Sequence, residues 1–486
     1  MPIPSLDFTN LRTAYDLKET SPTEVILHIL DEVETRGDDG VWIHRLPAED
    51  LVARAEMLET LDEDTKAALP LYGLPFSVKD CIDVAGLPTT SACPDFAYTA
   101  SRTNLAIRRA IEAGGILMGK TNMDQFATGV VGTRTPYGVA RNPFNPEYIP
   151  GGSSSGAAVS VAAGLCSFAF GSDTGGSGRV PASYNNVVGL KPTLGLLSRT
   201  DMVNASLSFD TISIYALTSP DARTVLHVCQ GVDPEDCYGR APMNAPAMPA
   251  HPLRIAVPRR ADRQAFGNPE AEALFEAGLA ELTATGHVLH EIDFGDFLET
   301  SRMMFEGPWL AEREVQVGAF IDAHPGSIDP IVRQVIQSAK NYSASDAFKA
   351  MYRLHSYVQT IRRTFDSVDL IAVPTVGTTY TVAQVRADPI ATNATNGLYM
   401  NFVSMADLTA VAVPNGFLSS GVPMGITFVA PAFAEDFLCD VADAFHRRRV
   451  ATLGATGHHH PIHKISEKSA HTHSSIMASR ELGSGR

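Results

Sequence analysis

The sequence predicts an α/β protein in which helices cover both faces of one central β-sheet. Helical and strand-like segments alternate from the N-terminus to about residue 230, and this alternation is typical of such a sheet. Short apolar segments between helical ones recur in the second half. Because 44% of the 486 residues are hydrophobic, the chain can fill a large core. We therefore expect residues 1–455 to form a single domain, with residues 250–455 completing the same sheet.

The first half of the chain carries clear start and stop signals for its elements. The segment Ser21–Glu24 is a capping box with proline at the first helical position, and it predicts an amphipathic helix that continues through residues 25–36. The further predicted elements are a polar helix over 48–61, a buried strand ending in a turn within 69–86, a helix stopped by glycine over 103–115, and a strand over 116–122.

The second half opens after a connection and closes before a polar tail. Residues 241–252 have the composition of a surface connection. The elements predicted after it are a strand over 253–258, a helix over 268–286, and strands over 369–375 and 410–416. Residues 456–486 are rich in histidine and small polar residues, and we expect a disordered tail. A metal-binding tail is the alternative.

Composition excludes several classes of function. The net charge of -16, without a long basic run, argues against nucleic acid or an anionic membrane as partner. Six cysteines lie scattered without CxxC spacing, so we expect reduced thiols and no metal site. The first seventeen residues lack a secretory signal pattern, and no apolar run approaches eighteen residues. The expected compartment is the cytoplasm, and the expected partner is a small-molecule substrate.

Two Gly/Ser-rich loops stand inside the most hydrophobic third of the chain. GGSSSGAA covers residues 151–158 and GSDTGGSGR covers 171–179, with an apolar stretch between them. Neither loop supplies the lysine and hydroxyl of a P-loop, and GxGxxG is absent, so no motif supports nucleotide binding. A Ser-His-Asp triad would need a histidine in the ordered core, whereas these loops offer serine without histidine.

Serine chemistry without histidine needs another base. Gly175 and Gly176 allow successive backbone N–H groups to converge beside Ser177, as an oxyanion hole requires. Ser153 lies on the other loop. Lys79 closes an apolar run, and burial there would lower the pKa of its amine and free the lone pair. Each of these residues alone is commonplace, but their order and spacing together are specific.

With these blocks the sequence resembles the amidase signature family of serine hydrolases. The resemblance is strong from about residue 70 to 200 and continues in patches to about 435. It implies the family fold, a mixed central β-sheet with helices on both faces, and a Ser–cis-Ser–Lys triad with no cofactor. Ser177 would be the nucleophile, Ser153 the bridging serine after a cis peptide bond, and Lys79 the base. The implied oxyanion donors are the N–H groups of Thr174, Gly175, Gly176 and Ser177.

Within the family, residues 124–138, 176–186, 305–313 and parts of 410–434 are most similar to the amidase domain of allophanate hydrolases. Allophanate is a small planar anion derived from urea. The resemblance implies Arg313 as a clamp for its carboxylate, a role that suits a planar fork of donors. A surface arginine on a helix is the alternative. Further expected substrate contacts are Gln125, Gly129 and Thr133, with Gly178 altering the packing beside Ser177.

Two departures from that pattern leave alternatives open. A tyrosine commonly occupies the position of Phe305, and Phe305 cannot donate its hydrogen bond. The C-terminal domain that many of these relatives carry has no counterpart before residue 486. Asp173 and Arg179 flank the nucleophile, and we expect them to pair and fix the loop. A broader amidase, a carbamate or biuret hydrolase, and a glutaminase-type subunit of a hetero-complex remain as other functions, and a homodimer is possible by resemblance.

Overall fold

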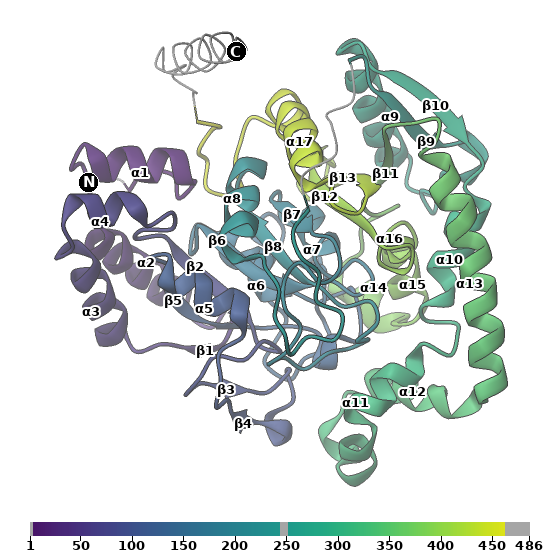
Figure 1. Cartoon of the computed structure of the whole chain (residues 1–486), viewed down its shortest axis with the longest axis horizontal. Coiled ribbons are helices and arrows are strands. Elements are labelled where there is room, and N and C mark those ends of the chain that lie inside the picture. Colours follow the sequence, from purple (N-terminus) through teal and green to yellow (C-terminus); the bar gives the residue numbers. More distant parts are fainter. Residues whose placement is uncertain (1–2, 244–250, 462–486) are drawn as a thin grey trace, which may run out of the picture.

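The computed structural model describes residues 3–243 and 251–461, and these residues build one mixed sheet of eleven strands (Figure 1). The strand order is β1-β5-β2-β6-β8-β7-β12-β13-β11-β9-β10. The strands are β1 Trp42–Arg45, β2 Pro75–Lys79, β5 Ile116–Thr121, β6 Phe168–Ser172, β7 Val188–Lys191, β8 Ile212–Ala216, β9 Arg254–Pro258, β10 Val288–Ile292, β11 Leu370–Pro374, β12 Leu408–Phe417 and β13 Pro423–Pro431. A separate ladder joins β3 Pro88–Thr89 to β4 Tyr98–Thr99.

Helices cover both faces of this sheet, as predicted. In β11, Leu370 and Ala372 belong to one hydrophobic cluster while Ile371 and Val373 belong to another, because successive side chains point to opposite faces of a strand. The first cluster includes side chains of α8 Ser219–Cys229, α9 Pro269–Ala284 and α17 Glu435–Arg449. The second includes α10 Gly295–Met303, α13 Ala344–Thr364 and α16 Asn401–Met405.

Of the remaining helices, α6 and α7 pack against central strands of the sheet, and others surround its two ends. In Figure 1 the first helices gather around β1, β2 and β5, while the long α13 runs along the opposite side with α11 and α12 at its end. Their bounds are α1 Phe8–Asp16, α2 Pro22–Arg36, α3 Ala48–Glu59, α4 Glu63–Ala68, α5 Leu105–Glu112, α6 Ser155–Ala162, α7 Val180–Tyr184, α11 Leu310–Ala323, α12 Pro330–Gln337, α14 Val382–Ala387 and α15 Ala391–Gly397.

The start signals in the sequence act as expected. The Ser21 side chain accepts a hydrogen bond from the Glu24 amide, and the Glu24 carboxylate accepts one from the Ser21 amide, which completes the capping box of α2. The strand predicted within 69–86 is β2, the strand over 116–122 is β5, and the strands predicted in the second half are β9, β11 and β12. Strands from both halves therefore share one sheet.

The predicted boundary of the C-terminal tail is too early. Residues 456–461 pack against the end of α17: the Leu453 amide donates to the His458 carbonyl, and the His460 ring bonds the Val450 carbonyl. Residues 244–250 of the predicted connection and 462–486 of the predicted tail lie outside the described residues. Among the described helices, none combines the length and the apolar character needed to cross a membrane.

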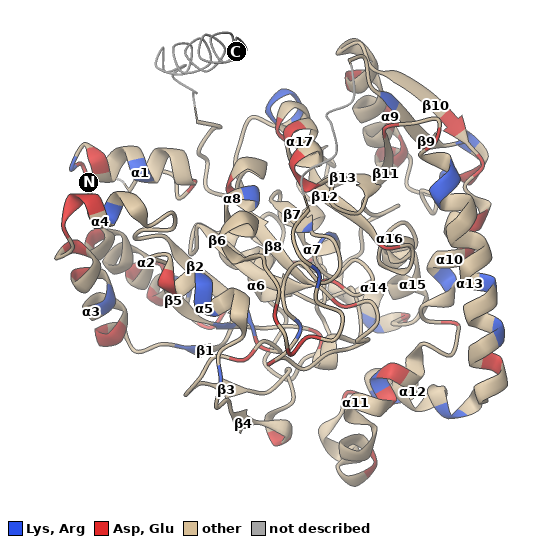
Figure 2. Ribbon diagram, viewed as in Figure 1, with Lys and Arg blue, Asp and Glu red and all other residues tan. Residues whose placement is uncertain are grey.

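Charged side chains of both signs share the outer helices. Figure 2 shows acidic and basic residues together along α3, α13 and α17. In α17, Glu435 and Asp436 stand in the first turn and Arg447–Arg449 in the last, an order that complements the helix dipole.

Two parallel strand pairs bring three strand ends to one edge of the sheet. Strand β2 pairs in parallel with both β5 and β6, with Val78 opposite Lys120 on one side and Phe170 on the other. The carboxyl ends of these strands therefore lie side by side, and the loops that follow them meet there. In open α/β sheets this is the edge where ligands bind. Lys79 ends β2 and Ser172 ends β6.

Candidate active site

Lys79 is the last residue of β2 and is fully buried. Hydrogen bonds join its Nζ to Ser153 Oγ at 2.6 Å and to Ser172 Oγ at 2.7 Å. Burial lowers the pKa of the Lys79 amine, against the opposing effect of Cys81 and of Asp124, because a low-dielectric interior disfavours the charged form. The arrangement therefore favours a neutral amine in contact with a serine hydroxyl, which is what a base needs.

Ser153 stands two residues before α6, and the peptide bond between Gly152 and Ser153 is cis. Ser153 is fully buried. The next residue, Ser154, ties this loop to β6: its hydroxyl donates to the Ser172 carbonyl at 3.1 Å and accepts from the Ser172 amide at 3.2 Å. A side chain at position 152 would collide with the Asp124 carboxylate and with the amides of the loop around it. This close approach explains why glycine precedes Ser153.

Ser177 lies on the loop between β6 and α7 and is 2% exposed. The Tyr215 hydroxyl on β8 donates to the Ser177 carbonyl at 2.7 Å and so fixes the backbone of this residue. Within the described residues, no hydrogen bond joins the hydroxyls of Ser153 and Ser177. The structure thus brings Lys79 and Ser153 into direct contact and places Ser177 on the loop that follows the Ser172 contact of the same lysine.

The Asp173 carboxylate organises the loop that carries Ser177. It accepts hydrogen bonds from Arg179 Nε at 2.8 Å and Nη2 at 2.9 Å, so the expected pair is present and fully buried. It also accepts from the amides of Gly176 at 2.7 Å and Gly178 at 3.1 Å. Burial alone would raise the pKa of Asp173, but the charge and hydrogen bonds of Arg179 outweigh it and hold this pKa below its usual range.

The bonds of Asp173 correct one of the four expected oxyanion donors. The Gly176 amide points to the Asp173 carboxylate and is not available to a substrate oxygen. In the part of the chain that the structure describes, the amides of Thr174, Gly175 and Ser177 have no acceptor, and they keep the expected capacity to donate. The Thr174 hydroxyl donates to the Asp210 carboxylate, which fixes the first residue of this stretch.

Arg313 is buried on α11, not on the surface. Within residues 3–243 and 251–461, none of its three guanidinium nitrogens has a hydrogen-bond partner. The guanidinium carbon lies 5.1 Å from the ring centroid of Phe305, a cation–π distance. Burial lowers the pKa of Arg313, and the nearby Asp210 carboxylate opposes this. A buried cation without hydrogen bonds is costly unless an anion completes it.

A neighbouring glutamate holds α11 in place beside this loop. The Glu312 carboxylate accepts hydrogen bonds from the Ser206 hydroxyl at 3.0 Å and from the Ser208 amide at 2.8 Å. The same loop supplies Asp210, which binds Thr174 beside the expected nucleophile. The helix that carries Arg313 is thus tied to the residues that border Ser177.

Gln125, Gly129 and Gly178 are packed closely against other residues of the protein. The Gln125 Nε2 donates to the carbonyls of Ala92 and Ser327, and its Oε1 accepts from the Asp329 amide. A side chain at Gly129 would meet the side chains of Asp124 and Arg134. One at Gly178 would run into Ser213 on β8. The described contacts of these residues are thus with protein, and their expected contacts with substrate stay predictions.

Thr133 is half-buried, and no hydrogen bond is formed by its hydroxyl within the described residues. Its expected contact with substrate stays a prediction.

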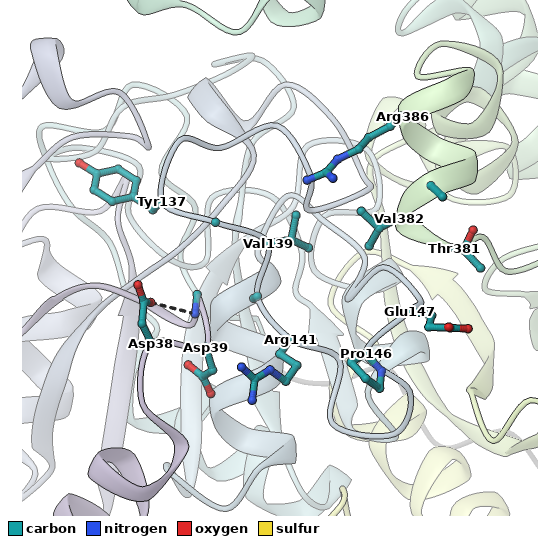
Figure 3. A pocket seen from close by; sticks show the side chains of 14 residues that line it. Asp38, Asp39, Tyr137, Val139, Arg141, Pro146, Glu147, Thr381, Val382 and Arg386 are labelled. Carbon is teal, nitrogen blue, oxygen red and sulfur yellow. Dashed lines mark hydrogen bonds between the residues drawn. The ribbon is translucent and has the colours of Figure 1, made fainter.

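Size alone does not locate the active site. A hollow of about 690 Å³ lies between residues 38–40, 137–141, 146–147 and 381–386 (Figure 3). It is lined by Arg141, Arg386 and acidic side chains, and none of Lys79, Ser153 and Ser177 borders it. A smaller hollow of about 170 Å³ is lined by Phe305, Ser301 and Asn401 among others. This smaller one adjoins both the Arg313 stack and, through Asn401, the loop at Gly175.

The sequence analysis missed several residues that complete the site. Ser172 and Tyr215 contact the expected triad residues directly, and Asp210 fixes Thr174. Ser172 stands three residues before Gly175. It ends an apolar strand beside a parallel partner, and that position was the available signal. Tyr215, on a neighbouring antiparallel strand, carries no such signal. The described residues contain no group of three or more His, Cys, Asp or Glu side chains arranged to hold a metal ion.

We expect Ser172→Ala to lower kcat/KM about tenfold, since one hydrogen bond to Lys79 is lost. The lost acceptor stabilises the ammonium more than the amine, so its removal lowers the pKa of Lys79 further. If the neutral amine acts as the base, as the sequence predicts, the acidic limb of the kcat/KM profile should move to lower pH. Ser172→Thr should restore both values. An unchanged pH profile in the alanine variant would contradict this role.

Comparisons with known proteins find similar sequences along most of the chain. A family model described as Amidase matches residues 24–439. The chain is 40% identical over 438 residues to urea amidolyase of Saccharomyces cerevisiae, in an alignment that covers 88% of this chain and 24% of that protein. It is 31% identical over 474 residues to a glutamyl-tRNA(Gln) amidotransferase subunit of Chlorobium luteolum, with 90% and 96% covered.

Solved structures give the same grouping. The structure of Kluyveromyces lactis allophanate hydrolase has a TM-score of 0.86 and 36% identity, and the match covers 92% of this chain and 74% of that one. This chain spans about a quarter of the length of the yeast urea amidolyase that it matches.

Proposed function

The chain belongs to the amidase signature family, and from that premise we propose that it hydrolyses the terminal amide of allophanate and releases ammonia. In this proposal the Ser177 hydroxyl attacks the amide carbon. Its proton passes through Ser153 to neutral Lys79, and returns by the same path to the leaving nitrogen. Water then hydrolyses the acyl-enzyme. The amides of Thr174, Gly175 and Ser177 stabilise the oxyanion.

The unpartnered guanidinium of Arg313 is the observation that favours allophanate as the substrate. Its nitrogens are buried without hydrogen bonds, and a carboxylate would give this planar fork both charge and two parallel acceptors. The Phe305 ring lies beneath it and supplies a π-face in place of a hydroxyl. A neutral aliphatic or aryl amide would leave the cation uncompensated. The site therefore favours an acyl group that ends in a carboxylate.

The test compares allophanate with biuret, its neutral isostere, in wild type and Arg313→Met. We expect kcat/KM for allophanate to fall about 10²–10³-fold, since a buried ionic contact is worth about 3–4 kcal/mol in the complex. The value for biuret should change by less than about threefold. Equal losses on both substrates would remove Arg313 as a carboxylate clamp.

A stability measurement on the same variant separates recognition from structure. Because the wild-type guanidinium is buried without partners, Arg313→Met should leave the free energy of unfolding unchanged or raise it, in urea titrations without ligand. A loss of more than about 2 kcal/mol would mean that Arg313 mainly holds α11 in place.

A glutaminase-type function, as part of a hetero-complex, is the second candidate. The similarity to the glutamyl-tRNA(Gln) amidotransferase subunit of Chlorobium luteolum, which spans 96% of that protein, supports this candidate. Glutamine added to the substrate panel decides between them. A kcat/KM for glutamine above that for allophanate would replace the first proposal.

A further inference from the structure

Asn401 lines the hollow of about 170 Å³ and carries a buried acceptor without a partner among the described residues. Asn401 is the first residue of the short helix α16 and is 5% exposed. Nδ2 donates to the Ser301 carbonyl at 3.0 Å. This bond fixes the orientation of the amide, since a carbonyl accepts only from the nitrogen. Oδ1 therefore faces away from Ser301, and it has no partner among the described residues.

The surroundings of Oδ1 place it between the two ends of the proposed substrate site. A Cβ built on Gly175 would lie 2.5 Å from Asn401 Oδ1, so the oxygen touches the residue expected to hold the oxyanion. Asn401 and Phe305 line the same hollow of about 170 Å³, and Phe305 carries the Arg313 guanidinium on its ring. Asn401 is therefore next to Gly175 on one side and shares a hollow with Phe305, the ring that contacts Arg313.

We propose that Asn401 is a specificity-determining residue whose Oδ1 accepts a hydrogen bond from the N–H between the carbonyl and the carboxylate of the substrate. This inference rests on the proposed function. Allophanate has its groups in the matching order: an amide carbonyl, a central N–H and a carboxylate. With the carbonyl at Gly175 and the carboxylate at Arg313, the central N–H falls at Asn401.

Asn401 would affect substrate preference because a buried oxygen without a hydrogen-bond donor raises the free energy of the complex. A buried amide oxygen that loses water and gains no donor destabilises the complex. A substrate with CH₂ at the central position would leave Oδ1 in that state. Sites built to bond a substrate N–H reject the analogue that lacks it far more strongly than apolar pockets reject a change in size. Asn401 would therefore select urea-type acyl groups over their carbon analogues.

Malonamate provides the matched substrate, because it is allophanate with CH₂ in place of the central N–H. We would measure kcat/KM for both in wild type, Asn401→Leu and Asn401→Asp. Wild type should prefer allophanate by at least about tenfold. In Asn401→Leu this ratio should fall toward one, with malonamate little changed. Asn401→Asp keeps an acceptor but loses the Nδ2 bond to Ser301 that fixes its orientation, so its preference should fall between those of wild type and Asn401→Leu.

Asn204→Leu is the control for loss of a buried asparagine. The Asn204 Nδ2 donates to the carbonyls of Arg199 and Met202, and its Oδ1 also has no partner within the described residues. It borders neither of the two hollows described above. This variant should keep the wild-type ratio whatever its effect on stability, and melting temperatures of all variants report folding.

The outcomes separate this inference from the proposed function. If wild type hydrolyses neither substrate, both proposals fall. If wild type hydrolyses both without preference, or if Asn401→Leu lowers both by the same factor, the proposed function stands and the role of Asn401 falls. Loss of the ratio in the control as well would also overturn it.

Discussion

Replacement of Ser177 by alanine is expected to lower kcat for amide hydrolysis by about 10⁴-fold or more, since removal of a nucleophile leaves only binding and oxyanion stabilisation. The side chain forms no hydrogen bond within the described residues, so the free energy of unfolding should change by less than about 1 kcal/mol. Ammonia release by purified protein measures the first value, and urea titration the second.

A serine far from this loop gives the control. The Ser338 hydroxyl donates to the Val335 carbonyl at the end of α12, so Ser338→Ala should keep wild-type kcat. If Ser177→Ala retained more than a tenth of the wild-type kcat, Ser177 would not be the nucleophile.

The largest loss of stability is expected from Asp173→Asn. Its carboxylate receives two bonds from Arg179 and two from backbone amides, all buried. An amide NH₂ in place of one oxygen would face donors and leave the Arg179 charge unpaired. Breaking a buried ion pair costs about 3–5 kcal/mol. We expect this loss in the free energy of unfolding at neutral pH, together with a fall in kcat because the Ser177 loop loses its support.

The pH dependence of this difference has a definite sign. The folded state holds the pKa of Asp173 below its usual value, so its contribution is present above the unfolded pKa and is lost as pH falls through the folded one. Wild type and variant should converge only in strong acid. Glu235→Gln is the control, since the Arg102–Glu235 pair is exposed and should contribute less than about 1 kcal/mol. If Asp173→Asn also lost less than about 1 kcal/mol in the free energy of unfolding, the role of Asp173 would be contradicted.

Local sequence signals were sufficient for the elements named in the sequence analysis and for the burial of Lys79. Lys79 could be singled out because an apolar run that ends in lysine implies a buried amine, and burial follows from the run itself. The Asp173–Arg179 pair was also predictable, since both partners lie on one short loop. These features depend on neighbours in the chain, and periodicity and loop composition report such neighbours well.

Contacts between distant segments were not predictable in the same way. Gln125 lies in residues 124–138, one of the stretches that carry the family resemblance. That resemblance does not indicate that its side-chain amide forms hydrogen bonds with Ser327 and Asp329. Gly178 was expected to alter the packing beside Ser177, but its sequence position does not say that Ser213 of β8 is the residue packed against it. No sequence pattern singles out Asn401, because its proposed role depends on its position next to Gly175, which is distant in the chain. The direction of a side chain depends on packing that one sequence does not record.

The strand order has a consequence for how specificity can change. The proposed proton path, from Lys79 through Ser153 to Ser177, is built from β2, β6 and their loops in the first half of the chain. The groups that would recognise the acyl part, Arg313 and Asn401, come from helices of the second half. Recombination between relatives near the surface connection could therefore exchange substrate preference while keeping the reaction. Chimeric proteins joined there would inherit their chemistry from one parent and their selectivity from the other.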